Sequence, residues 1–218
     1  ELSGMKRCVL LWFGLLLAWE TNAQLRHGPR LGLALATQTA GQFLQWSGLP
    51  KIGPIVGWSF DIPLRGQIGM RVEPMLMSKG SWARDAVTNT NTFTTLRYLE
   101  LPLLLRLDMQ PAEDGLFLTG GPIYGYWLNG RYRTVVDGQE TVDLTYDLSQ
   151  SGVQRTQWSM ALGLGGQGKN WSWEVRGQSS VSPFDRLQKG QNVVFGIHLT
   201  YRLPRKPPDA DEKEAPED

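Results

Sequence analysis

Six charged residues stand at even spacings within segments that are otherwise apolar or rich in small residues, a spacing that places neighbouring charges on one face of an extended chain. They are Arg71, Glu73, Glu100, Arg106, Glu174 and Arg176. Three acids and three arginines can pair across neighbouring strands, and Glu100 is expected to pair with Arg71 or Arg106. If these segments are strands that enclose an interior too narrow for a water column, the buried charges must pair with one another. The network is therefore expected to be a structural plug. An ion path or proton relay along the same residues is the alternative.

Two histidines raise the question of catalysis. His198 shares a face with Thr200, and His27 precedes the first apolar segment. A lipid A deacylase or acyltransferase would need a histidine and a nucleophilic serine at one rim, and no such pair is visible in the pattern. No cluster has metal-ligand spacing, and "LGLGGQG" at 162–168 lacks the strand-then-helix context of a phosphate-binding loop. The sequence predicts no catalytic residue, no metal site and no cofactor.

The elements that position these side chains are predicted to be β-strands. In "TTLRYLELPLLLRLDM" (94–109), leucines alternate with polar residues or proline, and a period of two indicates a strand. Seven other segments share this character, and connections of alternating length, including a long loop at 79–93, separate them. The fold is therefore predicted to be all-β, an eight-stranded antiparallel up-and-down transmembrane β-barrel with long outer loops and short periplasmic turns. The expected strands are 30–38, 52–61, 65–78, 94–109, 115–128, 155–168, 171–179 and 192–203.

The apolar faces of these strands are expected to contact lipid. A soluble barrel of lipocalin type is the alternative, because it also has eight strands. The lysines all fall at expected signal, strand-end, loop or tail positions, whereas a soluble barrel would carry them along its wet outer faces. The opposite faces carry small residues that suit a crowded interior, and aromatic residues lie near strand ends as in membrane barrels. The predicted location is a bacterial outer membrane.

The two ends of the chain differ from this barrel. From Met5, two basic residues precede an apolar run that ends in Thr21-Asn22-Ala23, the layout of a secretory signal peptide. We therefore expect a signal peptide at 1–23 with an extension at 1–4, the barrel at 24–203, and a disordered acidic tail at 204–218. An even strand number places both ends on the short-turn side, so the C-terminus is expected in the periplasm. The net charge of +1 argues against nucleic acid as a partner.

The longest connection, about 129–154, is expected to project beyond the membrane. Asp137-Gly138 lies between two β-like runs and predicts a hairpin turn. Aromatic and basic residues near this hairpin could form a recognition surface for protein or glycan, although loop aromatics also pack hairpins. The candidate recognition residues are Trp127, Arg131, Tyr132, Arg133 and Tyr146.

Two motifs resemble a known family. "YLELPLLLRL" has the form aromatic-x-Glu-x-Pro-Leu-Leu, and "GGPIYGYWL" follows one hairpin later as a Gly-Pro-x-x-Gly strand. With the "NAQ" boundary, the chain resembles, over about residues 25–203, the outer-membrane β-barrel family that includes the PorT-like proteins. This resemblance implies an OmpA-type eight-stranded barrel. Some members are linked to protein secretion through the type IX system, and most have no assigned activity.

The preferred function is non-enzymatic: a barrel with a plugged lumen and a structural or interaction role, of which an accessory subunit of an envelope secretion or assembly complex is one form. A small-solute pore and a lipid-modifying enzyme are the alternatives. The expected partners are outer-membrane lipid and other envelope proteins that contact the outer loops or the acidic tail.

Overall fold

The computed structural model describes residues 25–40, 45–46, 49–85, 87–110, 114–145, 155–183 and 191–204. The expected signal peptide and nearly all of the expected acidic tail lie outside these residues, and so does Tyr146. Every regular element in the described part is a β-strand. No helix there is long and apolar enough to cross a membrane.

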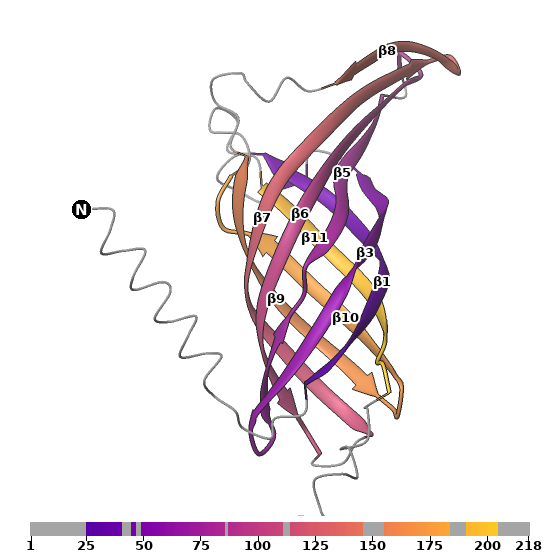
Figure 1. Ribbon diagram of the computed structural model, residues 1–218. Coiled ribbons are helices and arrows are strands. Elements are labelled where there is room, and N and C mark those ends of the chain that lie inside the picture. Colours follow the sequence, from indigo (N-terminus) through magenta and orange to yellow (C-terminus); the bar gives the residue numbers. More distant parts are fainter. Residues whose placement is uncertain are drawn as a thin grey trace, which may run out of the picture.

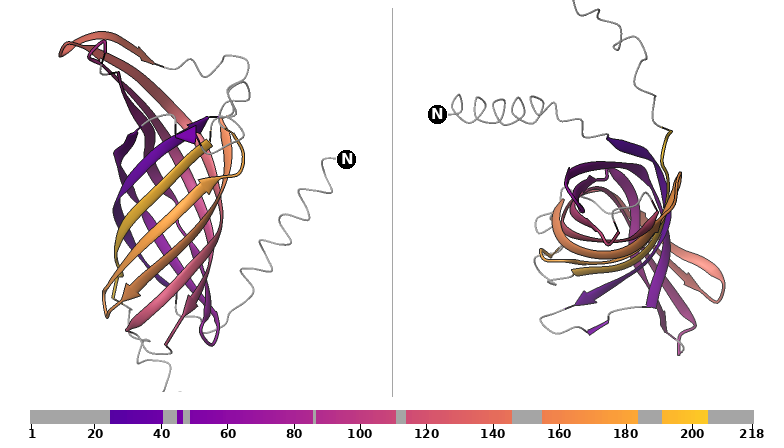
Figure 2. Two further views of the ribbon diagram at one scale, coloured as in Figure 1. Left: turned by 180° about the vertical axis from the view of Figure 1, so that it is seen from behind. Right: turned by 90° about the horizontal axis from the view of Figure 1, so that it is seen from below.

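Eight antiparallel strands close into a ring, which Figure 1 shows from the side and Figure 2 also from below. Neighbours in the chain pair with each other, and β1 pairs with both β11 and β3, which closes the barrel. β4 and β5 act as one strand interrupted at Glu73 and Pro74, where the amide of Trp58 donates to the carbonyl of Pro74 at 3.0 Å. The ring consists of β1 (Arg26–Ala40), β3 (Leu49–Arg65), β4 (Ile68–Val72) with β5 (Met75–Asp85), β6 (Thr90–Asp108), β7 (Gly115–Val136), β9 (Thr156–Gln167), β10 (Trp171–Ser180) and β11 (Gln191–Tyr201). The predicted fold class is confirmed.

Two further strands stand outside the ring. β2 (Gln45–Trp46) pairs with the end of β1, and β8 (Gln139–Thr145) pairs with the end of β7. Asp137 and Gly138 connect β7 to β8 with φ of 49° and 81°. Positive φ at both central residues matches the right-handed twist of the strands, which is why Asp-Gly is favoured there. The predicted hairpin is confirmed.

The alternation along β6 points its apolar face outward. Its five leucines at odd positions from 99 to 107 are 38–59 % exposed, whereas Glu100 and Arg106 are 1 % and 4 % exposed. Apolar side chains outside and polar side chains inside are the arrangement of a membrane barrel and the reverse of a soluble one. The predicted orientation of the strand faces is therefore confirmed.

Aromatic side chains mark both ends of the outward apolar band. We call the end of the barrel with the short turns between β3 and β4 and between β9 and β10 the short-turn rim. Near it, the rings of Trp171 and Tyr201 lie 4.9 Å apart. Toward the opposite rim, the rings of Tyr124 and Trp158 lie 5.2 Å apart in an edge-to-face arrangement. Amphipathic rings at two levels fit the two interfaces of a bilayer.

The predicted long loop at 79–93 is wrong. β5 continues to Asp85 and β6 already begins at Thr90, so these strands, with β7 and β8, rise beyond the others (Figure 1). The segment carries no apolar alternation because neither of its faces meets lipid, and cross-strand pairs such as stacked Trp82 and Phe93, 6.0 Å apart, stabilise it instead. Lys79 consequently lies within β5 and is 1 % exposed, which contradicts its assignment to a strand end or loop.

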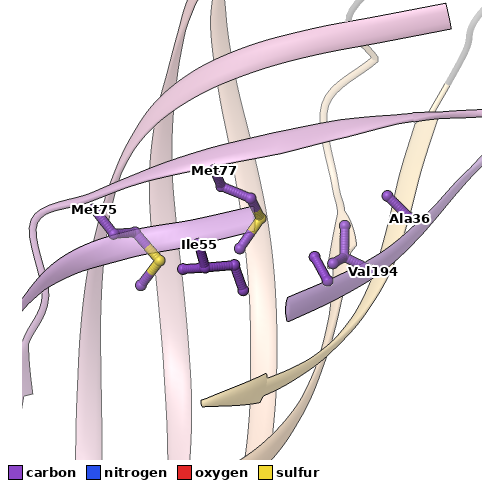
Figure 3. Close-up of a cluster of buried hydrophobic side chains, with 6 residues drawn as sticks. Ala36, Ile55, Met75, Met77 and Val194 are labelled. Atoms are coloured by element: carbon purple, nitrogen blue, oxygen red, sulfur yellow. The ribbon is translucent and has the colours of Figure 1, made fainter. Parts of the chain in front are cut away.

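The interior also holds apolar clusters. Figure 3 shows one of them, in which Ile55, Met75 and Met77 lie on neighbouring strands, with Ala36 and Val194 nearby. Each of these five side chains is at most 3 % exposed. Apolar groups thus fill part of the interior next to the charged residues.

Candidate functional site

A cluster of buried charges fills the half of the barrel near the short-turn rim. Three guanidinium groups, from Arg30 on β1, Arg71 on β4 and Arg176 on β10, converge on two carboxylates. The carboxylates belong to Glu73, at the break between β4 and β5, and Glu174 on β10. All five side chains are 0–2 % exposed. Each charge therefore depends on the others for its stabilisation.

Glu174 lies at the centre of this cluster. Its Oε2 accepts hydrogen bonds from Arg30 Nη2 at 2.7 Å and Arg71 Nη1 at 2.9 Å. Its Oε1 accepts from Arg176 Nε at 2.9 Å and from the hydroxyl of Thr119 at 2.6 Å. Four charge-assisted or hydroxyl donors on one carboxylate hold it in a single position.

A glycine provides the space for this carboxylate. A Cβ atom at Gly163, on the neighbouring strand β9, would lie 2.4 Å from Glu174 Oε1 and 2.6 Å from Thr119 Oγ1. Both distances are well below van der Waals contact. Gly163 thus makes room for polar side chains from β7 and β10, and Gly165 in the same stretch makes room for the ring of Phe117.

Glu73 joins the same arginines from the opposite wall. Arg176 approaches it through two nitrogens, Nη1 at 2.6 Å and Nη2 at 3.1 Å, and Arg30 Nη1 lies at 3.3 Å. β4 and β10 are four strands apart in either direction around the eight-stranded ring. The contacts of Arg71 with Glu174 and of Arg176 with Glu73 therefore cross the whole lumen.

A second layer continues the network toward the short-turn rim. Asp61 on β3 accepts from Arg71 Nη2 and from Arg106 Nη1, each at 2.9 Å. Arg106 also contacts Asp108 at 2.6 Å. The ring of Phe117 lies between the two guanidiniums, with Arg106 Cζ 4.1 Å and Arg71 Cζ 4.7 Å from its centroid. Four arginines and four carboxylates are thereby joined through ion pairs, with no net charge.

Glu100 does not belong to this network. It pairs with Lys79 and accepts from Gln178 Nε2 at 3.2 Å, nearer the other rim. Along β6, six residues, or about 20 Å of strand, separate it from Arg106. The expected pairing of Glu100 with Arg71 or Arg106 is wrong for this reason. The structure therefore brings five of the six predicted residues together and leaves Glu100 in a separate pair.

Four members of the interior charge pairs were missed in the sequence, and one of them, Asp108, stands on the same face of β6 as Arg106, two residues farther along. Arg30 shares the face of Gly32, Ala34 and Ala36, so a longer first strand would have identified it. Asp61 ends the small-residue face that contains Gly57 and Ser59. Lys79 lay in the wrongly predicted loop, and no local signal marks it.

Among the described residues, neither histidine is hydrogen-bonded to a serine hydroxyl. His198 is 2 % exposed, and its Nδ1 accepts from Arg30 Nε at 3.3 Å. His27 accepts from Trp58 Nε1 at 3.4 Å and lies near the ring of Phe60. Within the described part of the chain, no three His, Cys, Asp or Glu residues are grouped as metal ligands.

The candidate recognition residues fall into two groups. Trp127 is 2 % exposed, stacks on Tyr98 inside the barrel and donates from Nε1 to the carbonyl of Asn129 at 2.8 Å, so it is not part of a surface. Arg131 lies on the projecting hairpin, is 57 % exposed and donates from Nε to Asp143 at 2.6 Å.

The neighbouring residues on this hairpin are also described. Arg133 lies 5.5 Å from the centroid of Phe93 and 3.7 Å from Glu140, and Tyr132 is half-buried on the other face of β7. Asp143 is exposed, and the hydrogen bond from Arg131 lowers the pKa of its carboxyl. The hairpin surface is therefore organised by exposed ion pairs.

The chain was compared with known protein families, curated proteins and solved structures. Residues 18–186 match a family model described as "Outer membrane protein beta-barrel domain". No curated protein gives a significant match.

Several solved structures are similar. One is Ail, the attachment invasion locus protein of Yersinia pestis, in complex with the heparin analogue sucrose octasulfate, with 10 % identity, 83 % of this chain and 99 % of that chain covered, and a TM-score of 0.49. Another is Neisserial surface protein A, with 7 % identity, 81 % and 97 % covered, and a TM-score of 0.43. A third is the N-terminal β-barrel domain of Pseudomonas aeruginosa OprF, with 8 % identity, 80 % and 97 % covered, and a TM-score of 0.28.

Proposed function

Since this chain belongs to the family of outer-membrane β-barrel proteins, we propose that it is a non-enzymatic barrel with a plugged lumen that serves as an interaction protein of the outer membrane. In this role it is an accessory subunit of an envelope secretion or assembly complex. The chain enters the membrane after signal-peptide removal and keeps its C-terminus in the periplasm.

The ion pairs that cross the lumen carry the proposal of a plug. Arg71 and Glu174, 2.9 Å apart at 0 % exposure, belong to strands on opposite walls, so the charged side chains meet in the middle. An eight-stranded barrel has interior room only for side chains. A permeating ion would have to separate buried pairs whose disruption costs about 3–5 kcal/mol each.

The projecting strands support the interaction role. β5 to β8 extend beyond the other strands and present a surface of arginines and aromatic rings, which are enriched at protein interfaces (Figure 1). The engagement of both histidines with partners other than serine favours this role over a lipid-modifying enzyme.

Planar-bilayer recording of the folded full chain tests the plug. We expect no stepwise ion conductance. Stable conductance steps would instead assign the charges to a pathway and the protein to the small-solute pores. Mass spectrometry of membrane lipids, with and without expression of the chain, tests the enzyme alternative, and we expect the same lipid A species in both samples.

Photo-crosslinking in native membranes tests the interaction role. A photoreactive residue at Val135, on the projecting part of β7, is expected to crosslink to one defined envelope protein. The same group at Leu103, on the lipid-facing side of β6, is the matched control and is expected to label lipid alone. Lipid labelling at both positions would contradict an interaction role for the hairpin.

A further inference from the structure

The outward face of the projecting strands holds a polar groove of about 530 Å³. Its lining comes from three neighbouring strands, β6, β7 and β8, and includes Thr95, Arg97, Asn129, Arg131 and Thr145. Cross-strand pairing brings these residues together, because Thr95 is opposite Arg131, Arg97 is opposite Asn129, and Arg131 is opposite Thr145. The groove therefore presents guanidinium, amide and hydroxyl donors from one continuous sheet surface.

The two arginines in this groove have different partners. Arg131 donates hydrogen bonds from Nε and Nη2 to the carboxylate of Asp143, which also lines the groove. Arg97 is exposed and makes no hydrogen bond or ion pair with the residues that the structure describes. One of the two cations is thus balanced within the hairpin, and the groove keeps an excess positive charge.

The groove lies directly beyond the apolar band. Leu99 is 46 % exposed on the outward face of β6, and Arg97 is the next residue on that face, about 7 Å farther along the strand. Tyr126 on β7 is paired with Leu99 on β6, and the guanidinium of Arg155 lies 5.2 Å from the centroid of the Tyr126 ring. Arg97 on β6, Arg131 on β7 and Arg155, directly before β9, thus lie just beyond the outermost lipid-facing residues, at the depth where a bilayer places its head groups.

From these observations, and resting on the proposed placement in the outer membrane, we propose that the groove around Arg97 and Arg131 binds the phosphate of an anionic lipid head group in the outer leaflet. Guanidinium groups bind phosphate oxygens through paired N–H donors, and basic pockets next to membrane-spanning segments recognise phosphorylated head groups. The amide of Asn129 and the hydroxyl of Thr145 add donors at the same position, and the hydroxyl of Thr95, whose oxygen accepts from Lys51 Nζ, can donate its own proton to the ligand. The acyl chains of the bound lipid lie along the leucines of β6.

Binding of a phosphorylated lipid by the full chain in detergent micelles tests this proposal. The probes are lipid A with its phosphates and the same lipid A after enzymatic dephosphorylation, and native mass spectrometry measures the bound fraction. We expect the phosphorylated form to bind at least about tenfold more tightly, and Arg97→Gln to weaken it about tenfold. Arg84→Gln, which removes an exposed arginine on β5 outside the groove, is the matched control and is expected to leave binding unchanged.

Arg97→Gln is the decisive variant because it leaves the ion pair of Arg131 and Asp143 intact, and heat-induced unfolding checks that the barrel is folded. Equal binding of both lipid A forms, or an unchanged affinity in Arg97→Gln, would overturn the proposal. Inorganic phosphate is a separate probe, and Arg97-dependent competition by phosphate at micromolar concentration would assign the groove to a free anion and contradict a lipid ligand. This measurement is independent of the conductance and crosslinking experiments. A negative result would therefore overturn the lipid-binding groove without contradicting the proposed function.

Discussion

Lys79 and Glu100 form an ion pair inside the barrel between the neighbouring strands β5 and β6, and each side chain is 1 % exposed. The ammonium of Lys79 also lies 4.8 Å from the centroid of the Tyr98 ring, which itself stacks on Trp127. A lysine inside a membrane barrel is tolerated because its charge is neutralised on the inner side of the wall.

The first prediction concerns this pair. Glu100→Gln leaves Lys79 without its counter-charge and is expected to lower the free energy of unfolding by about 3–5 kcal/mol. The double variant with Lys79→Met is expected to recover much of the loss, because no lone buried charge remains. Guanidinium titration of the barrel in lipid vesicles, followed by tryptophan fluorescence, measures both. Loss in the double variant equal to the sum of the single losses would show that the two residues do not act as a pair.

The second prediction concerns the space that Gly163 leaves for Glu174. Gly163→Ala places a methyl group 2.4 Å from the Glu174 carboxylate, which four donors hold in place, so we expect a destabilisation of about 1–3 kcal/mol. Gly120→Ala, on β7, is the matched control, since its nearest neighbours lie at 3.6 Å and the methyl group fits. The same titration compares them, and an equal tolerance of both alanines would contradict a rigid position for Glu174.

The third prediction tests the outward apolar face. Leu103→Arg, in the middle of this face on β6, is expected to lower the free energy of unfolding by about 2–4 kcal/mol in lipid vesicles. Val87, which is 95 % exposed at the turn between β5 and β6, offers the control. Val87→Arg is expected to have little effect, and a similar loss at both positions would show that residue 103 does not face lipid.

The fourth prediction concerns pH and the projecting hairpin. The hydrogen bond from Arg131 lowers the pKa of the Asp143 carboxyl below its ordinary value of about 3.9. The pair is therefore fully formed above that ordinary pKa and is lost as the pH falls through the lowered pKa of the folded state. In an NMR titration of the Asp143 side chain, Arg131→Ala is expected to return the pKa toward the ordinary value.

Asp85 provides the control for this titration. Its pKa is lowered by the hydroxyl of Thr88 and the amide of Val87, which Arg131 does not contact. The Asp85 titration is expected to be the same in both proteins. A change at Asp85, or an unchanged Asp143, would contradict the local origin of the shift.

The sequence by itself determined the strands that face lipid and most of the interior residues. A period of two assigns every second residue to one face, so the five leucines at odd positions 99–107 of β6 and the charged residues Glu100 and Arg106 were separated before any contact was known. The Asp137-Gly138 turn was equally local, because positive φ at two successive residues restricts the side chains allowed there. Where neither face meets lipid, as in 79–93, the pattern disappeared and the prediction was wrong.

Only the tertiary structure decided which charges meet. Closure of the ring places β4 opposite β10, so Arg71 reaches Glu174 across 103 residues of sequence and Arg176 reaches Glu73 across the same separation. The alternation of faces predicts that a side chain points inward. It does not predict how high along the barrel axis the side chain lies or which residue on the far wall it contacts. Those depend on strand tilt and on the stagger of pairing around the ring, which local sequence does not encode. Glu100 shows the consequence, because it shares the inner face of Arg106 on the same strand and is paired with Lys79 instead.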